Sequence, residues 1–125
     1  MGDIEAQGVA ALSVPQRRYN AVLTFDGEVR NGGLSQYFFN SSGDEWRDAL
    51  AGLDAMELKE RTAILREALA KFAPESLSEN RKERMLQLSK LAKGDDELDT
   101  RYYKSKENVD VMATRYVIKN SEAFR

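Results

Sequence analysis

Apolar residues recur along most of the chain at the three- and four-residue spacing of an amphipathic helix. The first such run is Ala21, Val22, Phe25 and Val29. Ser13 precedes this run, Gln16 lies three residues after Ser13 in the pattern of a capping box, and Pro15 falls in the first turn. The pattern predicts a helix that begins after Ser13 and ends near Arg30, because the Asn-Gly-Gly sequence at 31–33 tolerates the left-handed conformation that closes a helix.

The next segment, Leu34 to Asn40, is short and rich in aromatic residues. Tyrosine and phenylalanine favour strands, but the chain holds no second strand-like run to pair with this one. Leu34, Tyr37 and Phe38 follow helical spacing. We therefore expect a short buried helix here.

Two further apolar stripes predict helices on either side of a break near Glu57. Asp44 follows a turn and is placed as the N-cap of the first of these helices, because acids are favoured at a helix N-terminus. The stripe of this helix is Trp46, Ala49, Leu50, Leu53 and Met56. The stripe after the break is Leu58, Leu65, Ala68, Leu69 and Phe72, and Pro74 ends it.

The C-terminal part of the chain continues the helical pattern. Ser76 and Glu79 form a second candidate capping box, and Gly94 closes the helix that they open. The inward residues of that helix are Met85, Leu88, Leu91 and Ala92. The later positions at helical spacing are Leu98, Tyr102, Tyr103, Val109, Met112, Ala113, Tyr116 and Val117. The tyrosines in these stripes are expected in the core or at an interface rather than as platforms for stacking bases.

These patterns predict an all-α fold, a single compact bundle of about six to seven helices with short loops. No internal repeat or long linker divides the chain, so residues 1–125 are expected to form one helical domain. Residues 1–12 are expected to be a poorly ordered or loosely packed N-terminal segment.

Composition excludes most familiar active sites. The chain contains no cysteine and no histidine, which rules out disulfides, thiolate and Ser-His nucleophiles and the usual zinc sites. No stretch approaches the ~20 apolar residues of a membrane span, and the N-terminal sequence MGDIEAQG carries acids where a signal peptide carries positive charge. We therefore expect a cytoplasmic protein that has no cofactor and no membrane partner.

The net charge of −2 is unevenly distributed, with −5 over residues 1–57, +4 over residues 58–93 and −1 over residues 94–125. Nucleic-acid binding by the acidic first half is disfavoured, because phosphates must be neutralised by lysine and arginine. The middle third contains a basic stretch made up of Arg81, Lys82, Arg84, Lys90 and Lys93. Glu79 and Glu83 interrupt them, so a solvated helix face is preferred to a phosphate site and no direct nucleic-acid binding is expected.

Two groups of carboxylates could in principle form a metal site or an enzyme active site. The run Asp95, Asp96, Glu97 and Asp99 lacks the glycine and the final glutamate of a calcium loop, and it is interpreted as a helix start, so no metal is expected. A carboxylate-dependent enzyme could in principle pair two of Asp26, Glu28, Asp44 and Asp48, as glycosidases pair two acids. The sequence does not show the required separation, and this is the least favoured alternative.

Amide and aromatic side chains are most concentrated in the segment EVRNGGLSQYFFNSSGD, residues 28–44. Polar amides at Asn31, Gln36 and Asn40 alternate with aromatic residues between two helix boundaries. In the preferred interpretation Asn31 and the glycines cap a helix, the aromatic residues fill the core, and Gln36 and Asn40 satisfy backbone groups of neighbouring turns. The alternative is a partner-binding pocket.

The same segment carries a resemblance that extends from Pro15 to about Ala70 and, more loosely, over ELDTRYYKSKENVDVMATRYV. The hallmark is a helix ending in E-V-x-N-G-G, then hydrophobic-x-Q-[YF]-F-[FY]-N-S-S-G, then an amphipathic helix. In this chain it comprises Glu28, Val29, Asn31, Gly32, Gly33, Gln36, Tyr37, Phe38, Phe39, Asn40, Ser41, Ser42 and Gly43. The chain thus resembles the DNA mimic protein nineteen family. The resemblance implies an all-helical bundle that is not an enzyme, and a type member that acts as an acidic decoy on the DNA-binding surface of a regulator.

The net charge departs from this pattern, because a whole-surface DNA mimic should be strongly acidic. If mimicry is retained, the candidate residues are Asp44, Glu45, Asp48 and Asp54, which would bind a protein partner such as a basic DNA-binding regulator. The alternative is an immunity- or antitoxin-like inhibitor that uses Trp46 and Tyr37 as hydrophobic anchors. The sequence leaves a homodimer open.

Overall fold

The computed structural model describes residues 12–91 and 96–125. This part of the chain forms six α-helices and two short 3-10 helices, without strands. The α-helices are α2 (Val14–Phe39), α3 (Trp46–Ala55), α4 (Lys59–Ala70), α5 (Arg81–Ser89), α6 (Asp96–Lys104) and α7 (Val109–Lys119), and the 3-10 helices are η1 (Ser41–Glu45) and η2 (Ser121–Phe124). The predicted all-α fold class is confirmed. The prediction for residues 1–12 lies, apart from Leu12, outside the described residues.

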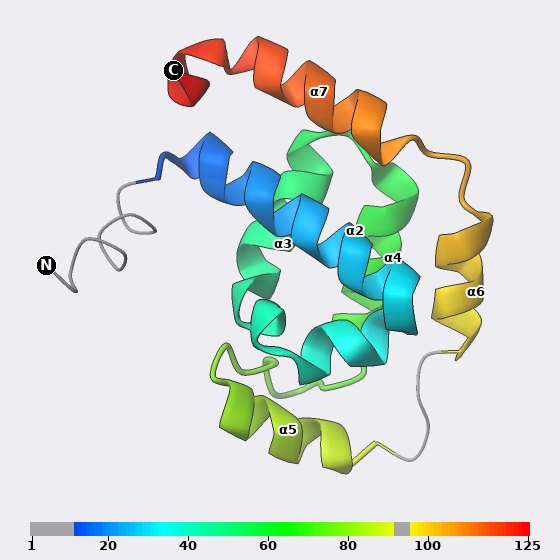
Figure 1. Cartoon of the computed structure of the whole chain (residues 1–125). Coiled ribbons are helices and arrows are strands. Elements are labelled where there is room, and N and C mark those ends of the chain that lie inside the picture. Colours follow the sequence, from blue (N-terminus) through cyan, green and yellow to red (C-terminus); the bar gives the residue numbers. More distant parts are fainter. Residues whose placement is uncertain (1–11, 92–95) are drawn as a thin grey trace, which may run out of the picture.

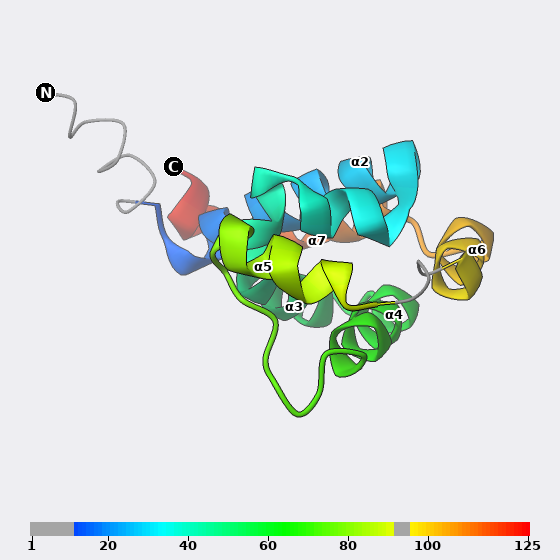
Figure 2. The same cartoon turned by 90° about the horizontal axis from the view of Figure 1, so that it is seen from below.

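Helix α2 is the central element of the bundle and crosses the molecule diagonally in Figure 1. Helices α3, α5, α6 and α7 all contact it, whereas α4 packs against α3 and α6. Helix α7 runs along one side of α2, and α5 lies across its far end (Figure 1). Figure 2 shows α3 and α4 below the level of α2, with the segment between α4 and α5 reaching away from the helices. Every part of the bundle therefore depends on the position of α2.

The start of α2 is the capping box predicted from the sequence. The Gln16 amide N–H donates to Ser13 Oγ at 3.2 Å, and the Ser13 N–H donates to Gln16 Oε1 at 2.9 Å. The Ser13 hydroxyl also donates to the carbonyl of Ala123 in η2 at 3.4 Å. The beginning of α2 and the end of the chain are therefore held together.

The predicted end of this helix near Arg30 is confirmed as a break in helical geometry, because Gly32 (φ −155°, ψ 17°) and Gly33 (φ 83°, ψ 178°) have non-helical backbone angles before the second arm of α2 continues to Phe39. Gly33 has φ 83°, a left-handed conformation that a residue without a Cβ adopts at little cost. The predicted short buried helix from Leu34 is therefore the second arm of α2. The glycines end the first helical arm, as predicted, and redirect the chain into the second.

The predicted start of the next helix at Asp44 is wrong, since α3 begins at Trp46. Residues Ser41–Glu45 form the 3-10 helix η1, and α3 begins at Trp46 behind Glu45, whose side chain makes no capping bond. The predicted break near Glu57 is confirmed, since Glu57 has φ 60° between α3 and α4. The Leu58 N–H then donates to the carbonyl of Leu53 at 3.0 Å.

The capping box predicted at Ser76 and Glu79 is not formed. The N-cap of α5 is Asn80, whose Oδ1 accepts the N–H of Glu83 at 3.1 Å. Ser76 and Glu79 instead contact Arg47 of α3, Ser76 by a hydrogen bond and Glu79 by an ion pair. The predictions for Ala92, Lys93, Gly94 and Asp95 lie outside the described residues, and α6 begins at Asp96 within the acidic run, as expected.

The buried core confirms most of the predicted apolar stripes. Its members include Phe25, Val29, Phe38, Trp46, Leu53, Leu58, Leu65, Leu98, Tyr102, Val109, Ala113 and Tyr116. Tyr103 is an exception, since its ring is half exposed while its hydroxyl donates to the Val29 carbonyl at 2.8 Å. Helix α5 contributes no fully buried apolar residue, and its one buried side chain is Arg84.

In the described ranges 12–91 and 96–125, no helix combines the length and the apolar character that crossing a bilayer requires.

Substitution of Gly33 by alanine should destabilise the fold. The added Cβ would lie 2.4 Å from Asp99 Oδ2 and would be held at φ 83°, so we expect a loss of about 2 kcal/mol or more in the free energy of unfolding. Gly27→Ala is the matched control, because its Cβ would meet no atom within 4 Å and alanine favours a helix interior by about 0.5–1 kcal/mol. Denaturant unfolding measures both variants, and an equal effect of the two would contradict the role of Gly33.

Candidate functional site

The amides of the Glu28–Gly43 motif converge on a single carboxylate. Glu28 Oε2 accepts the side-chain N–H groups of Gln36 at 2.9 Å and of Asn40 at 2.8 Å. Gln36 Oε1 in turn accepts from Asn31 Nδ2 at 3.4 Å. These bonds join the two arms of α2 across the bend at the glycines. Gln36 and Asn40, predicted to satisfy backbone groups, bind the Glu28 carboxylate instead.

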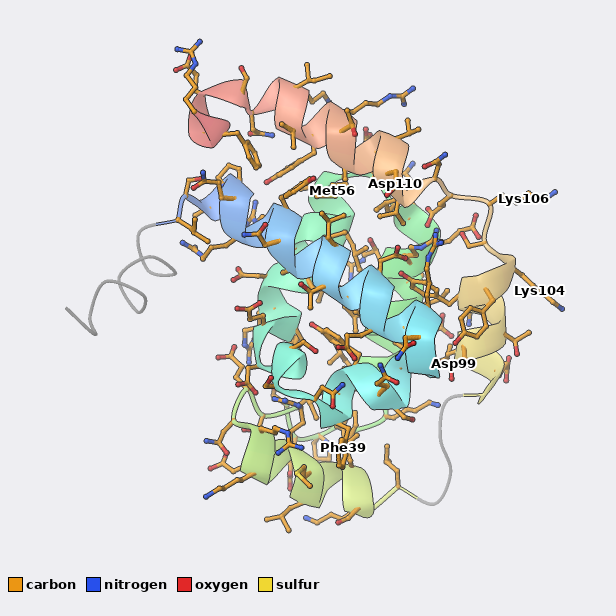
Figure 3. All side chains as sticks on the ribbon, viewed as in Figure 1. Phe39, Met56, Asp99, Lys104, Lys106 and Asp110 are labelled. Carbon is orange, nitrogen blue, oxygen red and sulfur yellow. The ribbon has the colours of Figure 1, made fainter. Side chains whose placement is uncertain are left out.

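The aromatic residues of the motif divide between core and surface. Tyr37 and Phe38 are buried, and the Tyr37 ring packs edge-on against Phe25 with centroids 4.8 Å apart. Phe38 packs edge-on against Phe72 at 6.2 Å. Phe39 is 48% exposed and lies where α2 meets α5 (Figure 3). The predicted core role is therefore confirmed for two of the three motif aromatics.

A buried arginine closes the end of α2. Arg84 of α5 has 0% exposure, and its Nε donates to the Phe38 carbonyl at 2.6 Å while Nη2 donates to the Asn40 carbonyl at 2.9 Å. Its Nη1 donates to the carbonyls of Ser78 and Glu79, both at 3.2 Å. The last carbonyls of a helix have no partner within the helix. Arg84 supplies partners for them, and the prediction that it lies on a solvated face is wrong.

Gly43 of the motif leaves the space that Arg84 occupies. A Cβ at Gly43 would lie 2.7 Å from the Tyr37 carbonyl and 3.0 Å from both Nε and Nη2 of Arg84. Any side chain at this position would displace the guanidinium. The glycine that ends the motif is therefore required by close packing against Arg84.

Arg81, one turn before Arg84 on α5, also donates to a carbonyl at the end of α2. Its Nε donates to the Phe39 carbonyl at 2.8 Å, and its guanidinium lies 5.1 Å from the centre of the Phe39 ring. Unlike Arg84, this side chain is exposed. Two arginines of α5 thus bind three successive carbonyls at the end of α2.

The acidic run at the start of α6 contributes to the bend in α2. Asp99 Oδ1 accepts the backbone N–H of Leu34 at 2.9 Å, directly after the glycines. Figure 3 shows Asp99 on the side of α6 that faces the bent end of α2. Asp99 therefore caps the second arm of α2 from another helix.

A second polar cluster lies in the core between α2, α4 and α6. Asp26 Oδ1 accepts the hydroxyl of Tyr102 at 2.6 Å, and Arg61 Nε lies 3.8 Å from the same oxygen. Arg61 is 2% exposed, its Nη1 pairs with Glu107 Oε1 at 3.2 Å, and its guanidinium lies 4.6 Å from the centre of the Tyr102 ring. The cluster joins the C-terminal end of α6 and the segment between α6 and α7 to the centre of the bundle.

The four acids predicted to bind a partner do not form a uniform negative face. Asp44 is paired with Arg84 Nη1 at 2.9 Å, and Asp48 with Arg17 Nε at 3.6 Å. Glu45 and Asp54 are exposed and have no ion pair with any residue of the described ranges. Asp44 and Asp48 are therefore paired with arginines, whereas Glu45 and Asp54 are exposed and unpaired within the described ranges.

The proposed hydrophobic anchors are buried. Trp46 is 6% exposed and Tyr37 is 1% exposed, and both belong to the core. A side chain in the core cannot insert into a partner's pocket without unfolding of the domain. The anchor prediction for these two residues is wrong.

Burial also removes two tyrosines from acid-base chemistry. Desolvation raises the pKa of Tyr37 well above its usual range, and the Glu45 carboxylate adds to this effect. Desolvation raises the pKa of Tyr102 likewise, helped by the hydrogen bond to Asp26. Both phenols stay protonated at neutral pH, so neither supplies an anionic nucleophile. Within the described ranges no three acidic side chains gather to hold a metal ion.

Sequence reasoning missed the roles of Arg84, Arg61 and Asp99, although their spacing carried a signal. Arg61 follows Leu58 by three residues and precedes Leu65 by four, so it lies within a predicted apolar stripe. Arg84 precedes Leu88 by four residues in the same way. A charged residue at an inward-facing position indicates a buried partner.

Comparison with known proteins gives one match. A family model described as DMP19-like protein matches residues 10–120. No curated protein and no solved structure matches the chain.

Replacement of Arg84 by lysine should strongly destabilise the domain, since one ammonium group cannot reach the carbonyls and the carboxylate that the guanidinium binds. We expect a loss of about 3 kcal/mol, the scale of a broken buried ion pair. Arg81→Lys is the matched control on the exposed side of α5 and should cost less than about 1 kcal/mol. Denaturant midpoints measure the difference, and equal midpoints would show that Arg84 does not organise the end of α2.

Replacement of Tyr102 by phenylalanine removes the hydroxyl that Asp26 accepts and should cost about 2 kcal/mol, as for a hydrogen bond to a charged group. Tyr37→Phe removes an equally buried hydroxyl that has no hydrogen-bond partner in the described ranges, so its cost should stay within about 0.5 kcal/mol. Thermal unfolding followed by circular dichroism compares the two. A larger loss in Tyr37→Phe would contradict the assigned role of the Asp26 cluster.

Proposed function

Because the chain belongs to the DMP19-like protein family, we propose that it is a non-catalytic, cytoplasmic protein-binding module that engages a basic DNA-binding partner through exposed carboxylates. The observation that carries this proposal is the pair Glu45 and Asp54 at either end of α3, exposed and without a neutralising base in the described ranges. Asp44 and Asp48 lie on the same segment. Their charges are partly offset by Arg84 and Arg17.

The spacing of these acids limits how much of a duplex they can imitate. Residues 44–54 span about 15 Å at the helical rise of 1.5 Å per residue. Duplex DNA presents one negative charge per about 1.7 Å along its axis, or about nine charges over this length. Four carboxylates, two of them paired, represent only part of that density. The proposal is therefore a local decoy that meets a few phosphate-binding side chains of the partner.

The non-catalytic assignment is supported by the state of the carboxylates that an enzyme would need. Glu28 Oε2 is occupied by two amides of the motif, and Asp26 is occupied by Tyr102 and by Arg30, whose Nε lies 3.1 Å from Asp26 Oδ2. General acids and bases must reach a substrate proton. Asp26 is engaged at both of its oxygens, and Glu28 is fixed in the fold through Oε2.

The inhibitor alternative loses its two anchors, because Trp46 and Tyr37 are buried. A partner that required these two side chains could contact only the exposed residues around them. Charge is therefore the better-supported basis of recognition.

The test uses competition between the protein and DNA. The immobilised chain is incubated with a lysate of its source at low ionic strength, and bound proteins are eluted first with short duplex DNA and then with about 0.5 M salt, at which exposed charges are screened within a few ångströms. A decoy and DNA occupy one site on the partner, so we expect a basic protein to be released by the duplex. A partner that stays bound in excess duplex would contradict the decoy.

The charge reversal Glu45→Lys with Asp54→Lys should reduce recovery of that protein by at least about tenfold, since two attractive contacts become repulsive. Glu75→Lys with Glu122→Lys is the matched control, because it makes the same net change at exposed acids elsewhere. Equal recovery by both variants would show that total charge, rather than the α3 segment, sets binding.

A further inference from the structure

The motif lines an open, polar surface pocket that its role in the fold does not explain. The pocket has a volume of about 420 Å³ and is lined by Glu28, Asn40, Ser41, Ser42 and Arg81. Four of these five residues belong to the Glu28–Gly43 motif, and the fifth comes from α5. We propose that this motif pocket binds a small zwitterion, a molecule that carries one ammonium and one carboxylate group.

The anionic wall of the pocket is fixed before any ligand arrives. Glu28 Oε2 accepts the amides of Gln36 and Asn40, which hold the carboxylate in one orientation. No bond from the described residues reaches the second oxygen, Oε1. A carboxylate that is positioned by one oxygen and open at the other can accept from a ligand's ammonium group at little entropic cost.

The cationic wall is fixed in the same manner. Arg81 Nε donates to the Phe39 carbonyl at 2.8 Å, and the guanidinium lies over the Phe39 ring. Its two terminal nitrogens bond to no group in the described ranges, so their N–H groups remain able to bind a carboxylate in the paired geometry that arginine favours.

The two charges line one pocket but do not pair with each other. No contact within the 4.0 Å limit of an ion pair joins Arg81 to Glu28, and each is held by its own bonds to the end of α2. A simple anion would be attracted by Arg81 and repelled by Glu28, and a simple cation would meet the reverse. A ligand with both charges gains from each wall, which is why the geometry favours a zwitterion.

The lining of the pocket also supplies a hydroxyl group. Ser41 is exposed in this lining, whereas Ser42 Oγ is shielded from solvent. The Ser41 hydroxyl both donates and accepts, so it can bond to either end of a zwitterion. The volume lies within the range of about 300–1,000 Å³ for small-ligand sites.

The test titrates the ¹⁵N-labelled full chain with zwitterions of increasing charge separation, namely glycine, β-alanine and 4-aminobutyrate, and follows backbone amide resonances. Acetate and methylammonium at the same concentrations represent each half of the ligand. We expect saturable shifts at Ser41, Ser42 and Gly43 with at least one zwitterion, and at least tenfold weaker binding of both half-ligands. Absence of shifts up to about 20 mM of every zwitterion, or equal binding of a half-ligand, would overturn the proposal.

The variant Arg81→Gln should abolish binding of the responding zwitterion while circular dichroism shows an unchanged fold. Lys82→Gln is the matched control, since it removes one exposed positive charge from the next position of α5. Retention of binding in Arg81→Gln, or the same loss in both variants, would place the interaction outside the motif pocket. Because the experiment uses no macromolecular partner and leaves Glu45 and Asp54 intact, its outcome is independent of the proposed protein-binding function.

Discussion

The contact between the Arg84 guanidinium and the carbonyls at the end of α2 attaches α5 to the central helix of the bundle. Helix α2 contacts most of the bundle, and its last carbonyls have no partners within the helix. Arg84 donates to the Phe38 and Asn40 carbonyls from α5, a helix that has no other fully buried side chain. Positive charge at a helix C-terminus is also favoured by the helix dipole. One side chain thus attaches α5 and closes the central helix.

This arrangement explains the residues of the Glu28–Gly43 motif. The glycines at 32 and 33 allow the bend, Glu28 collects the amides across it, and Gly43 leaves room for Arg84. Phe38 meanwhile extends into the core. The residues of the Glu28–Gly43 motif therefore build the end of α2, and the motif pocket is formed where they meet Arg81. The acidic segment that leads into α3 begins at Asp44, the residue directly after the motif.

The elements predicted correctly are those set by local patterns. The capping box at Ser13, the apolar stripes of α3 and α4 and the break at Glu57 depend on residues close in sequence, and the structure confirms them. The errors arise where a distant residue decides the outcome. Asp44 does not cap α3, because its carboxylate is attracted to Arg84, forty residues later in the chain. Spacing predicts which residues face inward, but it does not identify the groups that they meet there.

The Arg84 guanidinium is buried, and each of its three nitrogens donates to a carbonyl. Proton NMR of the ¹⁵N-arginine-labelled chain measures this directly, through exchange of the Arg84 side-chain N–H groups with water at neutral pH. The structure predicts an Arg84 Nε–H signal that persists and exchanges far more slowly than that of Arg30 or Arg125, which are exposed. An Arg84 signal that exchanges as fast as those two would contradict the central claim.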